Sequence, residues 1–118
     1  MCTQNQAISI MHEVYNACNP IFGVHLKDGY LYCAYARGDY HSESNIDILL
    51  TGDMSPEEIC RYWRAVTEVT SDLSLKHDIT ILVGVKAKTQ FEKYANDLPY
   101  YQNVLREGIR YGGMSIPF

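Results

Sequence analysis

The sequence predicts one α/β domain, in which a small mixed β-sheet is flanked by helices. Apolar residues recur at helical spacing in residues 8–18 and 59–70, whereas short apolar runs at 46–50 and 79–85 are typical of buried strands. Helical and strand segments that alternate in this way favour a sheet covered by helices. With 118 residues, 47% hydrophobic and 20% charged, the chain is long enough to bury one core of its own.

The first third of the chain predicts a helix and two short strands. The helix is expected to end at Asn19-Pro20, and its apolar face is formed by Ile8, Met11, Val14, Tyr15 and Cys18. A strand over 21–26, a tight Lys-Asp-Gly turn at 27–29 and a second strand over 30–34 follow. A short helix is expected from Ala36, before a polar loop at 39–44.

The rest of the chain predicts a strand, a long helix, a second strand and two shorter helices. The strand covers 46–50, and Ser55-Pro56-Glu57-Glu58 then marks a helix start with a capping box, so that the helix continues to about Ser74. Asp78 introduces a strand over 79–85, and Thr89 caps a short helix over 89–94. A last helix is expected from Leu98-Pro99 to Arg110. Residues 112–118 are expected to be a loose tail, which leaves a core of about 6–111 in a single domain, 1–118.

Composition narrows the classes of function. The net charge is -4 and no run of Lys or Arg is present, so binding to long nucleic acid is not expected. The four cysteines have no metal-binding or disulfide spacing. No basic leader or membrane-length apolar stretch occurs, which favours a cytoplasmic protein without a membrane partner. Ten tyrosines and an expected edge strand at 21–26 are compatible with a homo-oligomer.

Residues 32–47, YCAYARGDYHSESNID, are the most informative segment. Cys33-Ala34, ten residues and Asn45-Ile46-Asp47 have a spacing that resembles the Gly-Ser, ten residues, Asp-x-Asp pattern of minimal nucleotidyltransferases of the polymerase-beta-like superfamily. The Ala-Arg-Gly turn at 36–38 and the ending FEKYANDLPYYQNVLREGIRYG also resemble this family, in particular its bacterial members.

The resemblance implies a site that binds a nucleoside triphosphate (NTP) and Mg²⁺. It places nucleotide at Cys33, Ala34, Arg37 and Gly38, and metal at Asn45, Asp47 and Asp78, of which Asp47 and Asp78 are the expected catalytic carboxylates. Such sites transfer a nucleotidyl group by in-line displacement at phosphorus, with metal ions stabilising the attacking and leaving oxygens. Magnesium prefers carboxylate and phosphate oxygen ligands.

Three replacements weaken the step from fold to activity. Cys33 introduces a side chain where glycine allows the backbone to approach phosphate, and Ala34 removes a hydroxyl donor. Asn45 removes one negative charge from the metal side. The simpler alternatives are that Asp47 and Asp78 are solvated loop or strand-end aspartates, and that Arg37 only stabilises a loop.

Two hypotheses for function follow. The first is a catalytically impaired or inactive nucleotidyltransferase-fold protein that binds a partner, which the resemblance suggests is a helical protein of the HEPN type in a toxin–antitoxin pair. The alternative is an active Mg²⁺-dependent enzyme that transfers a nucleoside monophosphate from NTP to a protein tyrosine or a small molecule. The replacements at 33, 34 and 45 favour the first hypothesis.

Overall fold

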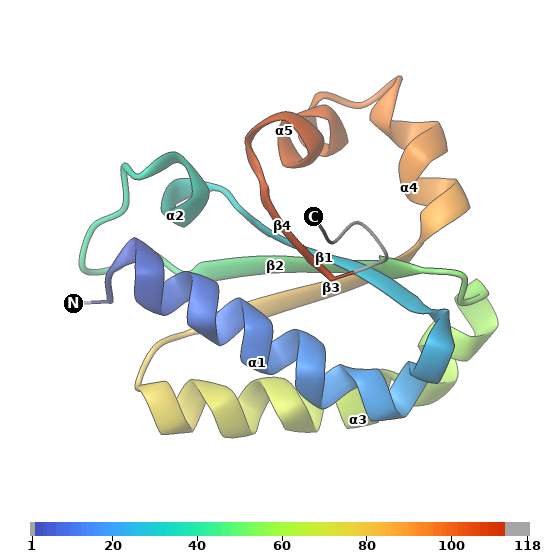
Figure 1. Cartoon of the computed structure of the whole chain (residues 1–118), viewed down its shortest axis with the longest axis horizontal. Coiled ribbons are helices and arrows are strands. Elements are labelled where there is room, and N and C mark those ends of the chain that lie inside the picture. The colour runs from blue at the N-terminus through green and yellow to red at the C-terminus, as the bar shows by residue number, and fades with distance from the viewer. Residues whose placement is uncertain (1, 113–118) are drawn as a thin grey trace.

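The computed structural model describes residues 2–112, which contain a four-stranded mixed sheet with strand order β3-β2-β1-β4. The strands are β1 (Leu26–Tyr32), β2 (Ile46–Gly52), β3 (Ile81–Ala87) and β4 (Ile109–Gly112). β1 pairs antiparallel with both β2 and β4, whereas β2 and β3 are parallel. The predicted fold class, a mixed sheet flanked by helices, is confirmed (Figure 1).

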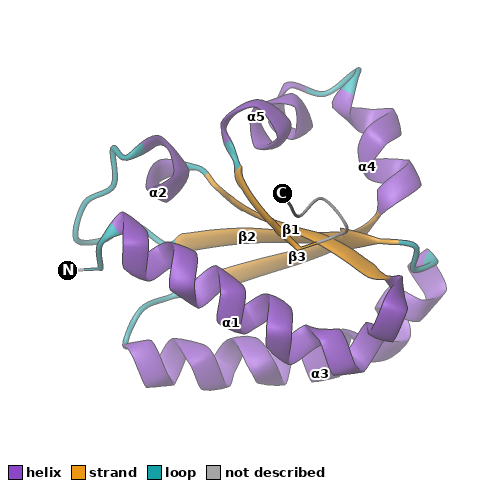
Figure 2. Cartoon of the chain, in the orientation of Figure 1, coloured by secondary structure: helices purple, strands orange, loops and turns teal. Residues whose placement is uncertain are grey.

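Helices cover both faces of this sheet (Figures 1 and 2). The long helices α1 (Gln4–Phe22) and α3 (Pro56–His77) pack on one face. The shorter helices α4 (Lys88–Ala95) and α5 (Pro99–Glu107) lie on the other, and α2 (Ala34–Arg37) directly follows β1. None of the helices in the described residues is both long and apolar enough to cross a membrane.

Successive side chains of β2 belong in turn to two hydrophobic clusters, one on each face of the sheet. Ile46, Ile48 and Leu50 belong to the larger cluster beneath α1 and α3, whereas Leu49 belongs to a smaller cluster with Phe91 of α4. Successive side chains of a strand point to opposite faces. Asp47 therefore lies on the α4/α5 side of the sheet, next to the smaller cluster.

The first helix is longer than predicted, because Pro20 does not end it. α1 continues to Phe22 and stops at Gly23, which has φ 63° and donates its N–H to the Asn19 carbonyl. Proline in a helix leaves the carbonyl four residues earlier without its donor. That carbonyl belongs to Asn16. Because Asn16 and Pro20 are both exposed, a water molecule can donate a hydrogen bond to it. The predicted strand at 21–26 is wrong for the same reason: a 3-10 turn, η1 (Gly23–His25), joins α1 directly to β1.

The predicted turn at 27–29 is also wrong, because these residues lie within β1. The pairing of β1 with β2 shifts register between Leu26 and Asp28, so the strand continues through these residues. Gly29 serves close packing, since a Cβ there would lie 3.2 Å from the Tyr15 ring and 3.3 Å from Leu50. The glycine thus allows α1 to approach the sheet.

The C-terminal region contains a strand that the sequence pattern did not reveal. α5 ends at Glu107 instead of Arg110, and β4 begins two residues later. Tyr111 stacks on His12 of α1 with ring centroids 3.9 Å apart. Gly112 of the expected tail belongs to β4, and residues 113–118 lie outside the described residues.

The central helix matches its predicted start. The Ser55 hydroxyl accepts from the Glu58 N–H at 3.1 Å, and the Glu58 side chain accepts from the Ser55 N–H at 3.3 Å, which completes the capping box. α3 continues three residues past Ser74 to His77, and β3 begins at Ile81 instead of 79. Thr89 does not cap α4, whose N-cap residue is Ala87.

Candidate functional site

The candidate site lies where β1 leads into α2 and β2 begins. Tyr32 of β1 is the antiparallel partner of Asp47, and Leu82 of β3 is its parallel partner on the other side. Paired residues on neighbouring strands point to the same face. Asp47 is therefore flanked by a tyrosine and a leucine on the α4/α5 side of the sheet.

The turn after β1 has a conformation that normally belongs to glycine. Cys33 has φ 62° and ψ −145°, and Asp78 is the other non-glycine residue with positive φ in the described part of the chain. A residue with a Cβ pays about 1–3 kcal/mol for such a conformation. The backbone of the glycine-type turn is thus present, although cysteine occupies it.

The side chains of Cys33 and Asp47 are close enough for each to shift the pKa of the other. Burial raises the pKa of Cys33, and the negative Asp47 raises it further, so the thiol stays protonated. Burial also raises the pKa of Asp47, and the neighbouring Cys33 thiol partly opposes this shift. The candidate carboxylate is therefore partly buried, with the Cys33 thiol beside it.

Arg37, the expected phosphate-binding side chain, is bound by acidic residues. Its Nε lies 3.1 Å from Asp39 Oδ2 and its Nη1 lies 3.8 Å from Glu107 Oε1 on α5. Each of the three side chains is more than one-third exposed. Exposed pairs of this kind contribute about 0–1 kcal/mol, so Arg37 can still exchange these partners for another anion.

The short helix α2 is held in place from behind by α1. Gln4 Nε2 donates to the carbonyls of Tyr35 and Ala36 at 2.8 and 3.2 Å. Tyr35 is almost completely buried and stacks on Tyr40 with centroids 4.5 Å apart. Gly38 ends α2 with φ 87°, and its N–H donates to the Ala34 carbonyl at 2.9 Å. The backbone position of Cys33 is thus fixed by several contacts.

The residues on the metal side do not fit a two-magnesium site. Asn45 is exposed and directly precedes β2, two residues before Asp47. The next strand presents Leu82 beside Asp47, a hydrophobic side chain that is 47% exposed. In residues 2–112 no group of three His, Cys, Asp or Glu side chains is arranged to hold a metal ion. One carboxylate and one amide leave most of the charge of two Mg²⁺ ions uncompensated.

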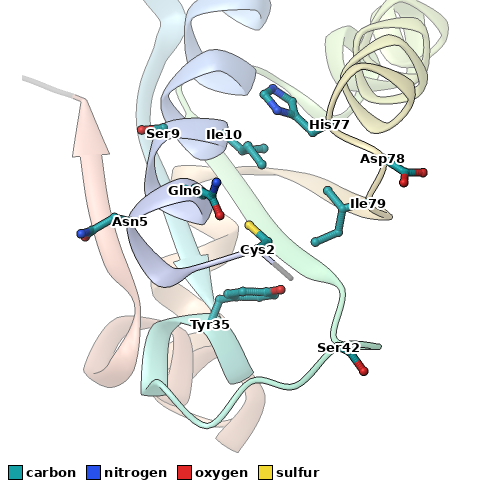
Figure 3. Close-up of a pocket in the computed structure, with 10 residues that line it drawn as sticks. All are labelled: Cys2, Asn5, Gln6, Ser9, Ile10, Tyr35, Ser42, His77, Asp78 and Ile79. Carbon is teal, nitrogen blue, oxygen red and sulfur yellow. The ribbon is translucent and has the colours of Figure 1, made fainter.

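The structure does not bring Asp78 to Asp47. Asp78 ends α3 with φ 52°, three residues before β3 begins. It lines a cavity of about 590 Å³ between the start of α1, Tyr35 and the α3–β3 corner, on the opposite side from Asp47. Figure 3 shows its carboxylate directed away from Cys2 and Tyr35, which are also lining residues.

Sequence reasoning missed Leu82 and Glu107 as neighbours of the site. The sequence predicts that β3 begins at residue 79, two residues before its observed start at Ile81. The register between β2 and β3 decides which residue lies beside Asp47, and it places Leu82 there. Glu107 approaches because β4 returns along β1 and brings the end of α5 towards Arg37. No local pattern in the sequence signals that contact.

The fold and the turn–strand arrangement at Cys33 and Asp47 define a nucleotidyltransferase-type domain. Two crystal structures of toxin–antitoxin complexes have the same fold. One, described with AMP-PNP, is 19% identical, has a TM-score of 0.53 and covers 86% of this chain and 74% of its own. The other, a mutant MntA–HpeT complex, is 16% identical and has a TM-score of 0.52. The match covers 96% of this chain and 75% of that chain. No protein-family model matches the chain.

Curated relatives establish the family. "Putative protein adenylyltransferase MJ0604" of Methanocaldococcus jannaschii is 34% identical over 96 residues, which cover 81% of this chain and 88% of that protein. "Putative protein adenylyltransferase MJ0141" of the same organism is 28% identical over 96 residues, covering 81% and 95%. The chain belongs to the minimal nucleotidyltransferase family.

Proposed function

We propose that this protein is a nucleotidyltransferase-fold binding module whose catalytic site is impaired. The observation that carries the proposal is that Cys33 occupies the glycine-type turn at φ 62°, directly after the β1 residue that pairs with Asp47. In the glycine-type turn the thiol occupies space that a phosphate would need, and it lies beside the carboxylate that a metal would need. A single side chain thus obstructs both functions of the site.

The metal side supports the same proposal. Asn45 and Leu82 flank Asp47 where additional carboxylates would have to compensate metal charge. Losing a hydrogen bond to an ionised group costs about 1.5–3 kcal/mol, and the chain has lost several such interactions together. Low residual affinity for Mg²⁺–NTP is therefore expected.

The partner we propose is a helical protein of the HEPN type, in an antitoxin-like pairing. Support comes from two toxin–antitoxin complexes of the same fold. Under this proposal binding uses the surface of the domain and does not require Asp47. A complex between this chain and a small helical protein encoded next to it should form equally well with the wild type and with Asp47→Ala.

The relatives named as protein adenylyltransferases favour a second candidate, a slow enzyme that transfers a nucleoside monophosphate to protein tyrosine or to a small molecule. Arg37, Gly38 and Asp47 remain available to it. Calorimetric titration with ATP, GTP, CTP and UTP, each with Mg²⁺, separates the two candidates. No binding at millimolar nucleotide supports the binding module. Metal-dependent binding by the wild type that disappears in Asp47→Ala would overturn the binding module with an impaired site.

A further inference from the structure

Strand β3 forms one edge of the sheet, and this edge is long and regular. The strand order in residues 2–112 is β3-β2-β1-β4, so no described strand pairs with the outer side of β3. All of β3, Ile81–Ala87, pairs in parallel with β2 without a shift of register. Proteins usually protect an edge strand with bulges, prolines or charges. β3 has no proline and a single charged residue, Lys86, and its Leu82 side chain is exposed.

Alternate residues of β3 direct their backbone groups away from β2. The Thr80 carbonyl accepts a hydrogen bond from the first residue of β2 at 3.0 Å. Because the N–H and C=O of one residue point to the same side of a strand and alternate along it, the odd-numbered residues of β3 face outwards. The Ile81 N–H donates to the Ser74 hydroxyl at 3.2 Å. Val83 and Val85 are therefore the residues that can bond to an added strand.

One side of helix α3 borders this edge. α1 and α3 lie next to each other on one face of the sheet (Figure 1). Lys76 of α3 binds Glu13 of α1 at 2.8 Å and so marks the side of α3 that faces α1. Ser74 precedes Lys76 by two residues, which places it nearly opposite, beside the edge of β3. Three further residues share the side of Ser74 at helical spacing: Trp63, Thr67 and Thr70.

This side of α3 is uncharged and suited to burial. Trp63 is 44% exposed. The hydroxyls of Thr67 and Thr70 donate to the carbonyls of Trp63 and Val66 at 2.9 Å, so the helix itself satisfies these donors. Covering the border would therefore leave no charge and no hydroxyl donor without a partner.

A second copy of the chain fits the edge in an antiparallel register centred on Gly84. In an antiparallel pair the outward-facing residues oppose one another, and this register sets Val83 against the second copy's Val85. All of β3 is then paired, and glycine faces glycine at the two-fold axis. Leu82 faces the second copy's Lys86, whose aliphatic stem covers the leucine while its ammonium group stays in water.

The charges of α3 favour the same arrangement. Gly84 lies roughly 10 Å along β3 from the contact of Ser74 with Ile81, which corresponds to about seven helical residues and hence to the middle of α3. The exposed charges around this level are two basic residues followed by two acidic ones: Arg61, Arg64, Glu68 and Asp72. Antiparallel copies of α3 bring the basic part of each helix towards the acidic part of the other. This complementarity points to a second copy as the added strand.

We propose that the protein forms a two-fold symmetric dimer through β3, which joins the two four-stranded sheets into one continuous sheet. Leu82 is the β3 neighbour of Asp47, so the second copy's Lys86 would lie next to each candidate site. The proposal is independent of the proposed function, because neither nucleotide nor a helical partner takes part in the contact.

Sedimentation velocity over a concentration series tests the dimer and its register. The wild type should dimerise with a dissociation constant in the micromolar range or below. Leu82→Lys sets two lysines opposite each other at both ends of the paired strands, and should weaken the dimer roughly tenfold or more. Adding Lys86→Glu to this variant should restore the dimer, because lysine and glutamate then face each other across the pair.

Leu105→Lys is the matched control. Leu105 is 48% exposed, as against 47% for Leu82, but it lies on α5 outside the proposed contact, so the dimer should be unchanged. Recovery in the double variant also shows that Leu82→Lys leaves the domain folded. A dimer that Leu82→Lys leaves intact, or a double variant that stays monomeric, would overturn the proposal. A monomeric wild type would overturn it as well, and would leave the edge open to a strand of another protein.

Discussion

Cys33 is held in a glycine conformation, and this strain can be measured by comparing two variants that both lack the thiol. Cys33→Ala keeps a Cβ at φ 62°, whereas Cys33→Gly removes it. Relief of the strain contributes about 1–3 kcal/mol, and the additional freedom of glycine in the unfolded chain offsets about 0.5–1 kcal/mol. Both variants lose the thiol and its interaction with Asp47, so this loss cancels in the comparison.

We therefore expect Cys33→Gly to be more stable than Cys33→Ala by about 0.5–2 kcal/mol in urea unfolding, the reverse of the usual order. Ala36→Gly in α2 is the matched control, because Ala36 lies inside the short helix. That substitution should lower the free energy of unfolding by about 0.5–1 kcal/mol. An alanine variant at 33 that equals or exceeds the glycine variant would refute the claim of backbone strain.

Three further substitutions test contacts that hold the fold together. Hydrogen bonding by Lys76 lowers the pKa of Glu13. The interaction should stabilise the fold fully above the ordinary carboxyl pKa of about 4.3, and this stabilisation should be lost as the pH falls through the lower pKa of Glu13 in the folded state. Glu13→Gln should therefore remove this part of the dependence of Tm on acid pH. Arg110→Leu leaves buried Asp28 without its guanidinium partner at 2.8 Å, and should cost about 2 kcal/mol or more in urea unfolding. An unchanged midpoint would contradict this. Gly29→Ala should cost about 1 kcal/mol, because its Cβ meets Tyr15 and Leu50; a stability gain would show that α1 can move away.

Local signals in the sequence predicted those parts of the fold that depend on nearby residues. The capping box at Ser55 and Glu58 and the buried run of β2 formed as expected, since each depends on residues close in sequence. Tertiary packing determined the rest. Lys-Asp-Gly at 27–29 is typical of a turn, yet Gly29 lies inside β1 because α1 needs the space. β4 forms only because β1 offers it an edge.

The candidate site shows the same division. The spacing between Cys33 and Asp47 placed two strands and a turn in one site, and the structure brings both residues together. The residue on β3 next to Asp47, where a further carboxylate was expected, depends on the exact register of β3 against β2. That register places Leu82 beside Asp47 and leaves Asp78 at the end of α3. A shift of two residues in a predicted strand boundary is enough to assign a different residue to this position.

Restoration of the missing groups tests most directly whether the replacements at this site prevent nucleotide binding. The combined variant Cys33→Gly, Ala34→Ser, Asn45→Asp and Leu82→Asp frees the turn and adds carboxylates near Asp47, one just before β2 and one on β3. Calorimetry with ATP and Mg²⁺ should detect binding to this folded variant and none to the wild type. Equal Mg²⁺-dependent ATP binding by the two proteins would contradict the account, because the wild-type residues would then already suffice.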